Sequence, residues 1–171
     1  MSKIRKFFKW WGSQNFIFFV LITVALSSLI LIPIGIISET LFPGWFSKIE
    51  EVTEGKILGY SGFLSALFSM CVIVPIIETL LFQLAPISLL ELVTESKYVQ
   101  VSVSSVLFGA SHGFNFVYVI ATLMIGAILA TGFIIGKNNK SRSFAFWAIV
   151  LSHSISNLIA LITSGNPLYS H

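Results

Sequence analysis

The chain has 171 residues, of which 56% are hydrophobic and only 10% are charged, and sixteen of them are phenylalanine. A soluble domain has about 25% charged residues, so this composition excludes an ordinary soluble protein and indicates an integral membrane protein. The net charge of +3 comes from basic residues near the ends of apolar runs, a placement that excludes a nucleic-acid-binding face.

Five apolar runs follow one another along the chain. A helix that crosses about 30 Å of hydrocarbon needs about 20 residues, and the first run lacks a small-residue cleavage site, so we expect a retained span there. The predicted spans cover about residues 16–38, 60–93, 98–113, 117–136 and 143–163. A polar segment with four carboxylates, residues 39–56, separates the first two. The sequence therefore predicts a single all-α domain, residues 1–171, built as a polytopic transmembrane helix bundle of about five spans.

The basic residues predict the orientation of this bundle. With five spans, the basic N-terminus, Lys97 and the basic segment 137–142 fall on one side, and only Lys48 and Lys56 fall on the other. Cytoplasmic loops carry an excess of lysine and arginine. We therefore expect the N-terminus in the cytoplasm and the C-terminus outside.

Three ionisable residues lie well inside the predicted spans: Glu78, His112 and His153. A charged group at mid-bilayer costs at least about 2.5 kcal/mol, so such residues usually line a cavity or pair with one another. If the chain turns near residues 94–97, then Glu78 and His112 are about 16 and 15 residues from the turn, or ~23 Å each, and are level. This requires a long second helix with a bend at Pro75 or Pro86.

The last span adds an amide at a similar depth. His153 and Asn157 are four residues apart and share a helical face, as do Phe108 and His112. A carboxylate and one histidine can hold and deprotonate a water, while a second histidine and an asparagine donate hydrogen bonds to a developing oxyanion. The four polar residues thus form a workable catalytic set.

The segments ETLLFQ, FGASH and HSISN occur in the order of three motifs, EExxxR, FxxxH and HxxxN, and in this the chain resembles the CAAX protease and bacteriocin-processing family of intramembrane endopeptidases. The resemblance implies a glutamate-type protease in a bacterial cell membrane that acts on a membrane-associated peptide or protein. In it Glu78 and His112 would activate water, and His153 with Asn157 would stabilise the tetrahedral intermediate. We expect no cofactor, and zinc held by Glu78, His112 and His153 is the alternative.

Two positions depart from the family pattern. Thr79 stands where the motif has its second glutamate, and Gln83 stands where it has arginine. The two are four residues apart, so we expect a neutral hydrogen-bonded pair in place of an ion pair. Because both members differ together, no uncompensated buried charge remains. Phe108 is interpreted as a packing wall under His112.

Other interpretations use the same residues. GASHG matches the G-x-S-x-G pattern of serine hydrolases and would pair Ser111 with His153 as in rhomboid-type proteases, but it leaves Glu78 unexplained. A second alternative keeps the fold without turnover, as an immunity or scaffold protein that binds a membrane peptide or partner. A proton-coupled transporter is a third, although no internal repeat is visible. Gly132 and Gly136 form a G-x-x-x-G pair that we assign to helix packing inside the protein.

Overall fold

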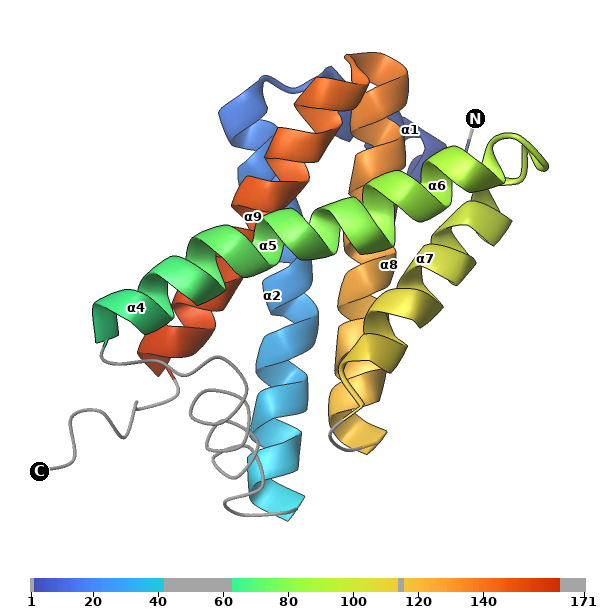
Figure 1. Cartoon of the computed structure of the whole chain (residues 1–171). Coiled ribbons are helices and arrows are strands. Elements are labelled where there is room, and N and C mark those ends of the chain that lie inside the picture. The colour runs from blue at the N-terminus through green and yellow to red at the C-terminus, as the bar shows by residue number, and fades with distance from the viewer. Residues whose placement is uncertain (1, 42–62, 114–115, 164–171) are drawn as a thin grey trace, which may run out of the picture.

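The structure, a computed structural model, describes residues 2–41, 63–113 and 116–163, and every regular element in these residues is helical. The long apolar helices are α2 (Phe16–Leu41), α8 (Phe116–Asn139) and α9 (Arg142–Thr163). In Figure 1, α8 lies between α7 (Lys97–Ser111) and α9, while a long oblique helix crosses in front of them. The predicted all-α, polytopic helix bundle is confirmed.

The oblique helix runs without interruption over residues 63–90 and is about 42 Å long at 1.5 Å per residue. Its five parts are α4 (Phe63–Phe68), the π-helical segment η1 (Ser69–Ile73), α5 (Val74–Glu78), the π-helical segment η2 (Thr79–Leu84) and α6 (Ala85–Leu90). The predicted second span is therefore long, as required, and its residues 60–62 lie outside the described part. In Figure 1 the helix passes Pro75 and Pro86 without a sharp kink, which differs from the bend expected there.

Each π-helical segment comes just before a proline. Proline has no N–H group, so an α-helix cannot complete its hydrogen bonds there, and a wider turn is one way to accommodate it. The Val74 N–H donates to the Ser69 carbonyl five residues back, and the Ala85 N–H donates to the Leu80 carbonyl in the same way. The prolines thus widen the helix locally.

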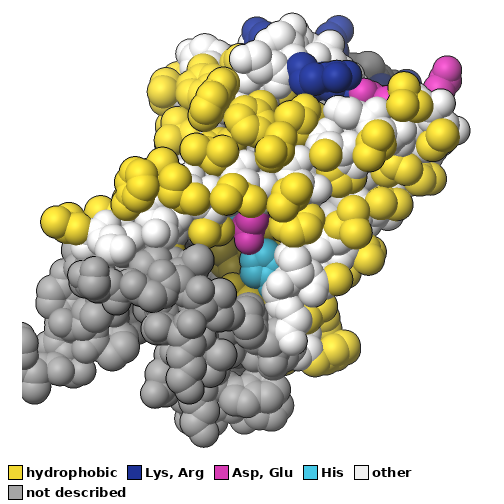
Figure 2. Space-filling view, in the orientation of Figure 1, with side chains coloured by type: hydrophobic (Ala, Val, Ile, Leu, Met, Phe, Trp, Pro, Cys, Tyr) yellow, Lys and Arg dark blue, Asp and Glu magenta, His cyan; other side chains and the backbone are white. Residues whose placement is uncertain are grey.

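Four described helices are long and apolar enough to cross a membrane: Phe16–Ile37, Ser69–Leu90, Phe116–Asn139 and Arg142–Ile162. The predicted span at 98–113 instead forms α7, whose 15 residues reach only about 22 Å. Large apolar side chains are exposed along the surface of the oblique helix and of α7, and Figure 2 shows them covering this face. Such a surface fits contact with lipid hydrocarbon.

Close packing holds α8 at the centre of the bundle. A Cβ at Gly132 would lie 2.9 Å from Ile149 of α9 and 3.2 Å from Trp11, and one at Gly136 would lie 3.2 Å from Ala145. Trp11 belongs to α1 (Lys3–Ser13) and is fully buried. The glycine pair therefore packs inside the protein, as predicted.

The basic segments gather at one end of the bundle. The Glu91 carboxylate, just after α6, forms ion pairs with Lys97, Lys137 and Arg142, which come from α7, α8 and α9. Lys140 donates to the Ser13 carbonyl at the end of α1. Figure 2 shows the lysine and arginine side chains concentrated at this end. Lys48 and Lys56, expected on the opposite side, lie outside the described residues.

Candidate active site

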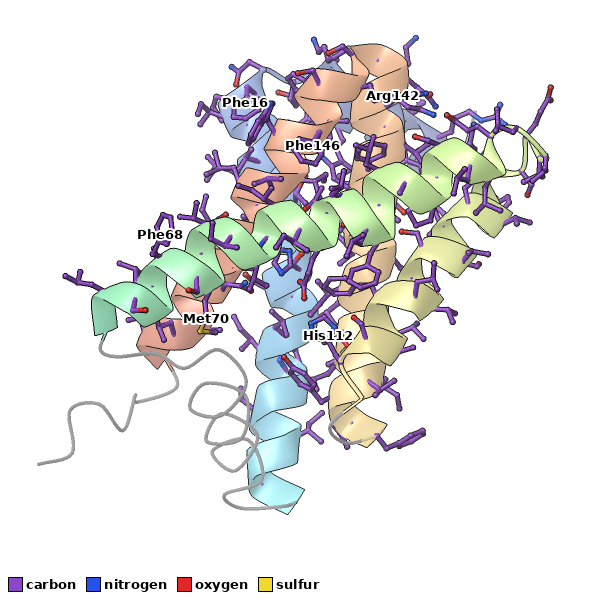
Figure 3. All side chains as sticks on the ribbon, viewed as in Figure 1. Phe16, Phe68, Met70, His112, Arg142 and Phe146 are labelled. Carbon is purple, nitrogen blue, oxygen red and sulfur yellow. The ribbon has the colours of Figure 1, made fainter. Side chains whose placement is uncertain are left out.

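Three helices bring Glu78, His112 and His153 together. The His112 Nε2 atom lies 3.6 Å from Glu78 Oε1, and the His153 Nε2 atom lies 3.4 Å from Glu78 Oε2. Glu78 ends α5, His112 caps α7, and His153 lies inside α9. Figure 3 shows the His112 side chain directed toward the oblique helix. The equal depth of Glu78 and His112, worked out from residue counts, is therefore present in the structure.

The three side chains are mostly but not fully shielded. Their exposed fractions are 18% for Glu78, 16% for His112 and 7% for His153. Figure 2 shows an acidic and a histidine side chain next to each other at the base of a hollow below the oblique helix. The Glu78 side chain is thus only partly exposed, and its Oε2 atom on the His153 side is buried without a hydrogen-bond partner among the described residues.

A backbone carbonyl fixes the ring of His112. The Nδ1 atom lies 2.7 Å from the Phe108 carbonyl oxygen, which can only accept, so we assign the proton of the neutral ring to Nδ1. The Nε2 atom then carries a lone pair and faces Glu78. Because α7 stops at Ser111, the His112 backbone has left the helical conformation, with φ −100° and ψ 35°. The chain end of α7 thus presents a hydrogen-bond acceptor to the carboxylate.

His153 offers the complementary group. The residue is buried in α9, and its Nδ1 atom has no hydrogen-bond partner within the described part of the chain. A neutral ring with its proton on Nε2 presents a donor toward Glu78 Oε2. No hydrogen bond joins Oε2 to a described residue, so the carboxylate lies between two imidazoles, one near each of its oxygens.

The ring of Phe108 packs against both imidazoles. Its centroid is 4.6 Å from that of His112 and 5.6 Å from that of His153. Gly126 of α8 leaves the room for this ring, since a Cβ there would lie 3.1 Å from Phe108. The packing role expected for Phe108 agrees with these contacts, and its carbonyl, which the sequence did not single out, orients His112.

Asn157 is placed differently from the prediction. Its Nδ2 atom donates to the Met70 carbonyl of η1 at 2.9 Å, about two turns of helix before Glu78. The structure thus brings three of the four predicted residues together, and the fourth contacts the backbone of the Glu78 helix. Asn157 bonds there because Pro75 has no N–H to donate to the Met70 carbonyl.

The expected hydrogen bond between Thr79 and Gln83 is wrong. Both side chains are fully buried, but Thr79 Oγ1 and both polar atoms of Gln83 have no hydrogen-bond partner among the described residues. The π-helical turn that contains both residues alters the four-residue spacing on which the expectation depended. The two side chains share a segment without bonding to each other.

The serine alternative is not supported by the geometry. The Ser111 hydroxyl donates to the Phe108 carbonyl at 2.7 Å and lies 3.1 Å from His112 Nδ1, so its histidine neighbour is not His153. The His153 Nε2 atom faces Glu78 instead. The Ser111–His153 dyad of this alternative is therefore not formed.

The alternative of a zinc site requires three donor side chains arranged around one point. Among residues 2–41, 63–113 and 116–163, no group of three His, Cys, Asp or Glu side chains is arranged to hold a metal ion. This includes Glu78, His112 and His153, the three residues considered as zinc ligands. Cys71 is partly buried in η1 with a free thiol.

Sequence reasoning missed Ser104, a buried residue of α7. Its hydroxyl donates to the Phe82 carbonyl in η2. A signal was available, because Pro86 follows Phe82 by four residues and therefore cannot supply the α-helical N–H. A polar side chain on a neighbouring span is the expected replacement.

Comparison with known proteins finds one family model that matches the region of the site. The family model described as "Type II CAAX prenyl endopeptidase Rce1-like" matches residues 60–159, which is 100 of the 171 residues and includes α5, α7 and most of α9. No curated protein and no solved structure matches the chain. The matched region contains Glu78, His112 and His153, and the chain belongs to the Rce1-like family of type II CAAX prenyl endopeptidases.

Proposed function

We propose that the protein is an intramembrane endopeptidase that hydrolyses a peptide bond in a membrane-associated peptide or protein. The observation that carries the proposal is the placement of one carboxylate between two imidazoles, at 3.6 Å and 3.4 Å, within apolar helices. Membership of a family of proteases supports the reaction class. Glu78, His112 and His153 are assigned the chemistry.

Glu78 and His112 activate the water. Glu78 Oε1 and His112 Nε2 are both acceptors, so a water about 2.8 Å from each donates a hydrogen to both. Its oxygen lone pair is then free to attack the substrate carbonyl while Glu78 takes the proton. The same proton passes to the leaving amine when the peptide bond breaks, so Glu78 acts as base and then as acid.

His153 stabilises the tetrahedral intermediate. Its ring is buried among apolar groups, where a hydrogen bond to a developing oxyanion is worth more than in water. With the proton on Nε2, the ring has its one N–H near Glu78 Oε2, the oxygen away from His112, and we assign this N–H to the oxyanion because it forms no hydrogen bond with Oε2. The part of Asn157 in the oxyanion site stays a prediction, since the contact described for its amide is with Met70.

One observation favours a second candidate function. At Thr79 and Gln83, where the family motif has an ion pair, the structure has two neutral side chains without hydrogen-bond partners among the described residues. If the ion pair is needed for turnover, the protein would keep the fold as an immunity or scaffold protein that binds a membrane peptide. The two functions differ in whether Glu78 must be chemically intact.

Incubation of the purified protein with peptides tests the proposal. We would use a farnesylated C-terminal peptide, the same peptide without its lipid, and a hydrophobic leader peptide, with products identified by mass spectrometry. Glu78→Gln keeps the size of the side chain and removes the base, so cleavage should fall by about 100-fold or more. Addition of a chelator tests the zinc alternative.

The outcomes separate the candidates. Cleavage by the wild type that Glu78→Gln and His112→Ala abolish supports the endopeptidase. Undiminished cleavage by Glu78→Gln refutes the site assignment. Retention of a peptide without any product, equal in the wild type and in Glu78→Gln, supports the scaffold instead.

The same proposal includes an orientation. The basic end of the bundle, with Lys97, Lys137, Lys140 and Arg142, faces the cytoplasm of a bacterial cell. Because α1 contacts this end and α9 starts there and runs away from it, the N-terminus is inside and the C-terminus outside. Reporter enzymes that are active only on one side of the membrane, fused to either end, test it. Activity of a cytoplasmic reporter at the C-terminus would contradict it.

A further inference from the structure

The helix that carries Glu78 contains a carbonyl that the backbone cannot satisfy. The donors available to the Met70 carbonyl are Val74 in an α-helix and Pro75 in a π-helix. The Val74 N–H donates to the Ser69 carbonyl, and Pro75 has no N–H. The Asn157 amide of α9 donates to the Met70 carbonyl at 2.9 Å and replaces the missing donor.

A second carbonyl, on the other side of Glu78, lacks its α-helical donor. The α-helical donor to the Phe82 carbonyl would be Pro86, which has no N–H. The hydroxyl of Ser104, a fully buried residue of α7, donates to this carbonyl. Side chains from two different helices therefore hold the Glu78 helix at two points, one on each side of the carboxylate.

These two donors belong to the helices that carry the two histidines. Asn157 lies one turn after His153 on α9, and Ser104 lies about two turns before His112 on α7. We propose that Asn157 and Ser104 are positioning residues that fix the Glu78 carboxylate relative to His153 and His112. The expected effect on catalysis rests on the endopeptidase function proposed above, whereas the two contacts with the Glu78 helix do not.

The size of the effect follows from the distances. Phe82 is four residues from Glu78 and Met70 is eight, or about 6 Å and 12 Å along the helix. A carbonyl without a donor is unfavourable inside a membrane, so loss of either side chain drives the π-helical turn to rearrange. Because a misplacement of about 1 Å can cost 100-fold in rate, we expect kcat to fall by about 10- to 100-fold in Ser104→Ala.

The single cysteine provides a test that needs no catalysis. Cys71 directly follows Met70 in η1, so the rate at which a maleimide modifies its thiol reports the opening of this segment. In a Glu78→Gln background, Asn157→Ala and the apolar replacement Asn157→Leu should each raise that rate by about threefold or more, since one hydrogen bond is lost. Ser156→Ala is the matched control, because the Ser156 hydroxyl bonds within α9 to the Ser152 carbonyl.

Unchanged labelling in both Asn157 variants, or an equal rise in Ser156→Ala, would overturn the proposal. In the active protein, Ser104→Ala should lower kcat with KM unchanged, and Ser104→Thr, which keeps the hydroxyl, should restore it. If Ser104→Ala leaves kcat at the wild-type value, the bond holds the helix without positioning Glu78, and the proposal is refuted. If the wild type cleaves nothing while the Asn157 variants still label faster, the proposed function fails and the contact with η1 stands.

Discussion

Gln83 and Gln100 are both fully buried but differ in their hydrogen bonds, so replacement by leucine should change the stability of the protein in opposite directions. Gln83 and Gln100 are both 0% exposed. The Gln100 amide donates to the Thr94 carbonyl at 2.9 Å and accepts from Lys97 at 3.4 Å, whereas neither polar atom of Gln83 has a hydrogen-bond partner among the described residues. Replacement by leucine removes a satisfied amide in one case and an unsatisfied one in the other.

We expect Gln83→Leu to raise the free energy of unfolding by about 1–3 kcal/mol, because a buried polar group without a partner costs that much. Gln100→Leu should lower it by about 1–3 kcal/mol, because the Thr94 carbonyl loses its donor. Denaturant unfolding in detergent, followed by circular dichroism, measures both values. A loss of stability in Gln83→Leu equal to that in Gln100→Leu would show that the Gln83 amide is bonded and would refute the reasoning.

Four further substitutions test packing, charge and mechanism. Gly109→Ala should lower the free energy of unfolding by about 1–3 kcal/mol, since its Cβ would lie 2.9 Å from Leu123. Gly35→Ala, whose Cβ would have no described atom within 4 Å, should be neutral or stabilising in the same unfolding assay. Glu91→Gln should destabilise the fold at high salt as well as low salt, because Lys137 is only 10% exposed and would lose its partner. Ser111→Ala should keep peptide cleavage within about fivefold of wild type, since loss of one hydrogen bond costs about 1 kcal/mol; a complete loss would revive the serine mechanism.

The helices and the meeting of Glu78 with His112 could be predicted because each depends on simple counting. Apolar runs of about 20 residues indicate spans, and a rise of 1.5 Å per residue from a shared turn places two residues at the same depth. The structure has Glu78 Oε1 and His112 Nε2 3.6 Å apart. This agreement did not need the side-chain directions, since histidine and glutamate are long enough to close the remaining gap.

The contacts of Asn157 and Gln83 could not be predicted from a regular helix. Residue counting assumed 3.6 residues per turn, but the segments before Pro75 and Pro86 are π-helical and rotate the face that each residue presents. As a result, the Asn157 amide donates to the Met70 carbonyl, and the side chains of Thr79 and Gln83 do not bond to each other. The prolines were visible in the sequence, but the choice of a widened turn over a kink depends on donors from α7 and α9.

The neutral residues Thr79 and Gln83 are expected to affect the stability of the protein and not the reaction at Glu78. A single charge left there without its partner would cost about 3–5 kcal/mol, whereas an unsatisfied neutral group costs about 1–3 kcal/mol, so Thr79 and Gln83 avoid the larger penalty and still leave polar atoms without partners among the described residues. Glu78 meanwhile faces the two imidazoles, not these side chains. Gln83→Leu should therefore change the free energy of unfolding while the peptide cleavage that depends on Glu78 is kept. If cleavage is lost in a Gln83→Leu protein that is more stable, the amide takes part in the reaction, and the assignment of the chemistry to Glu78, His112 and His153 alone is incomplete.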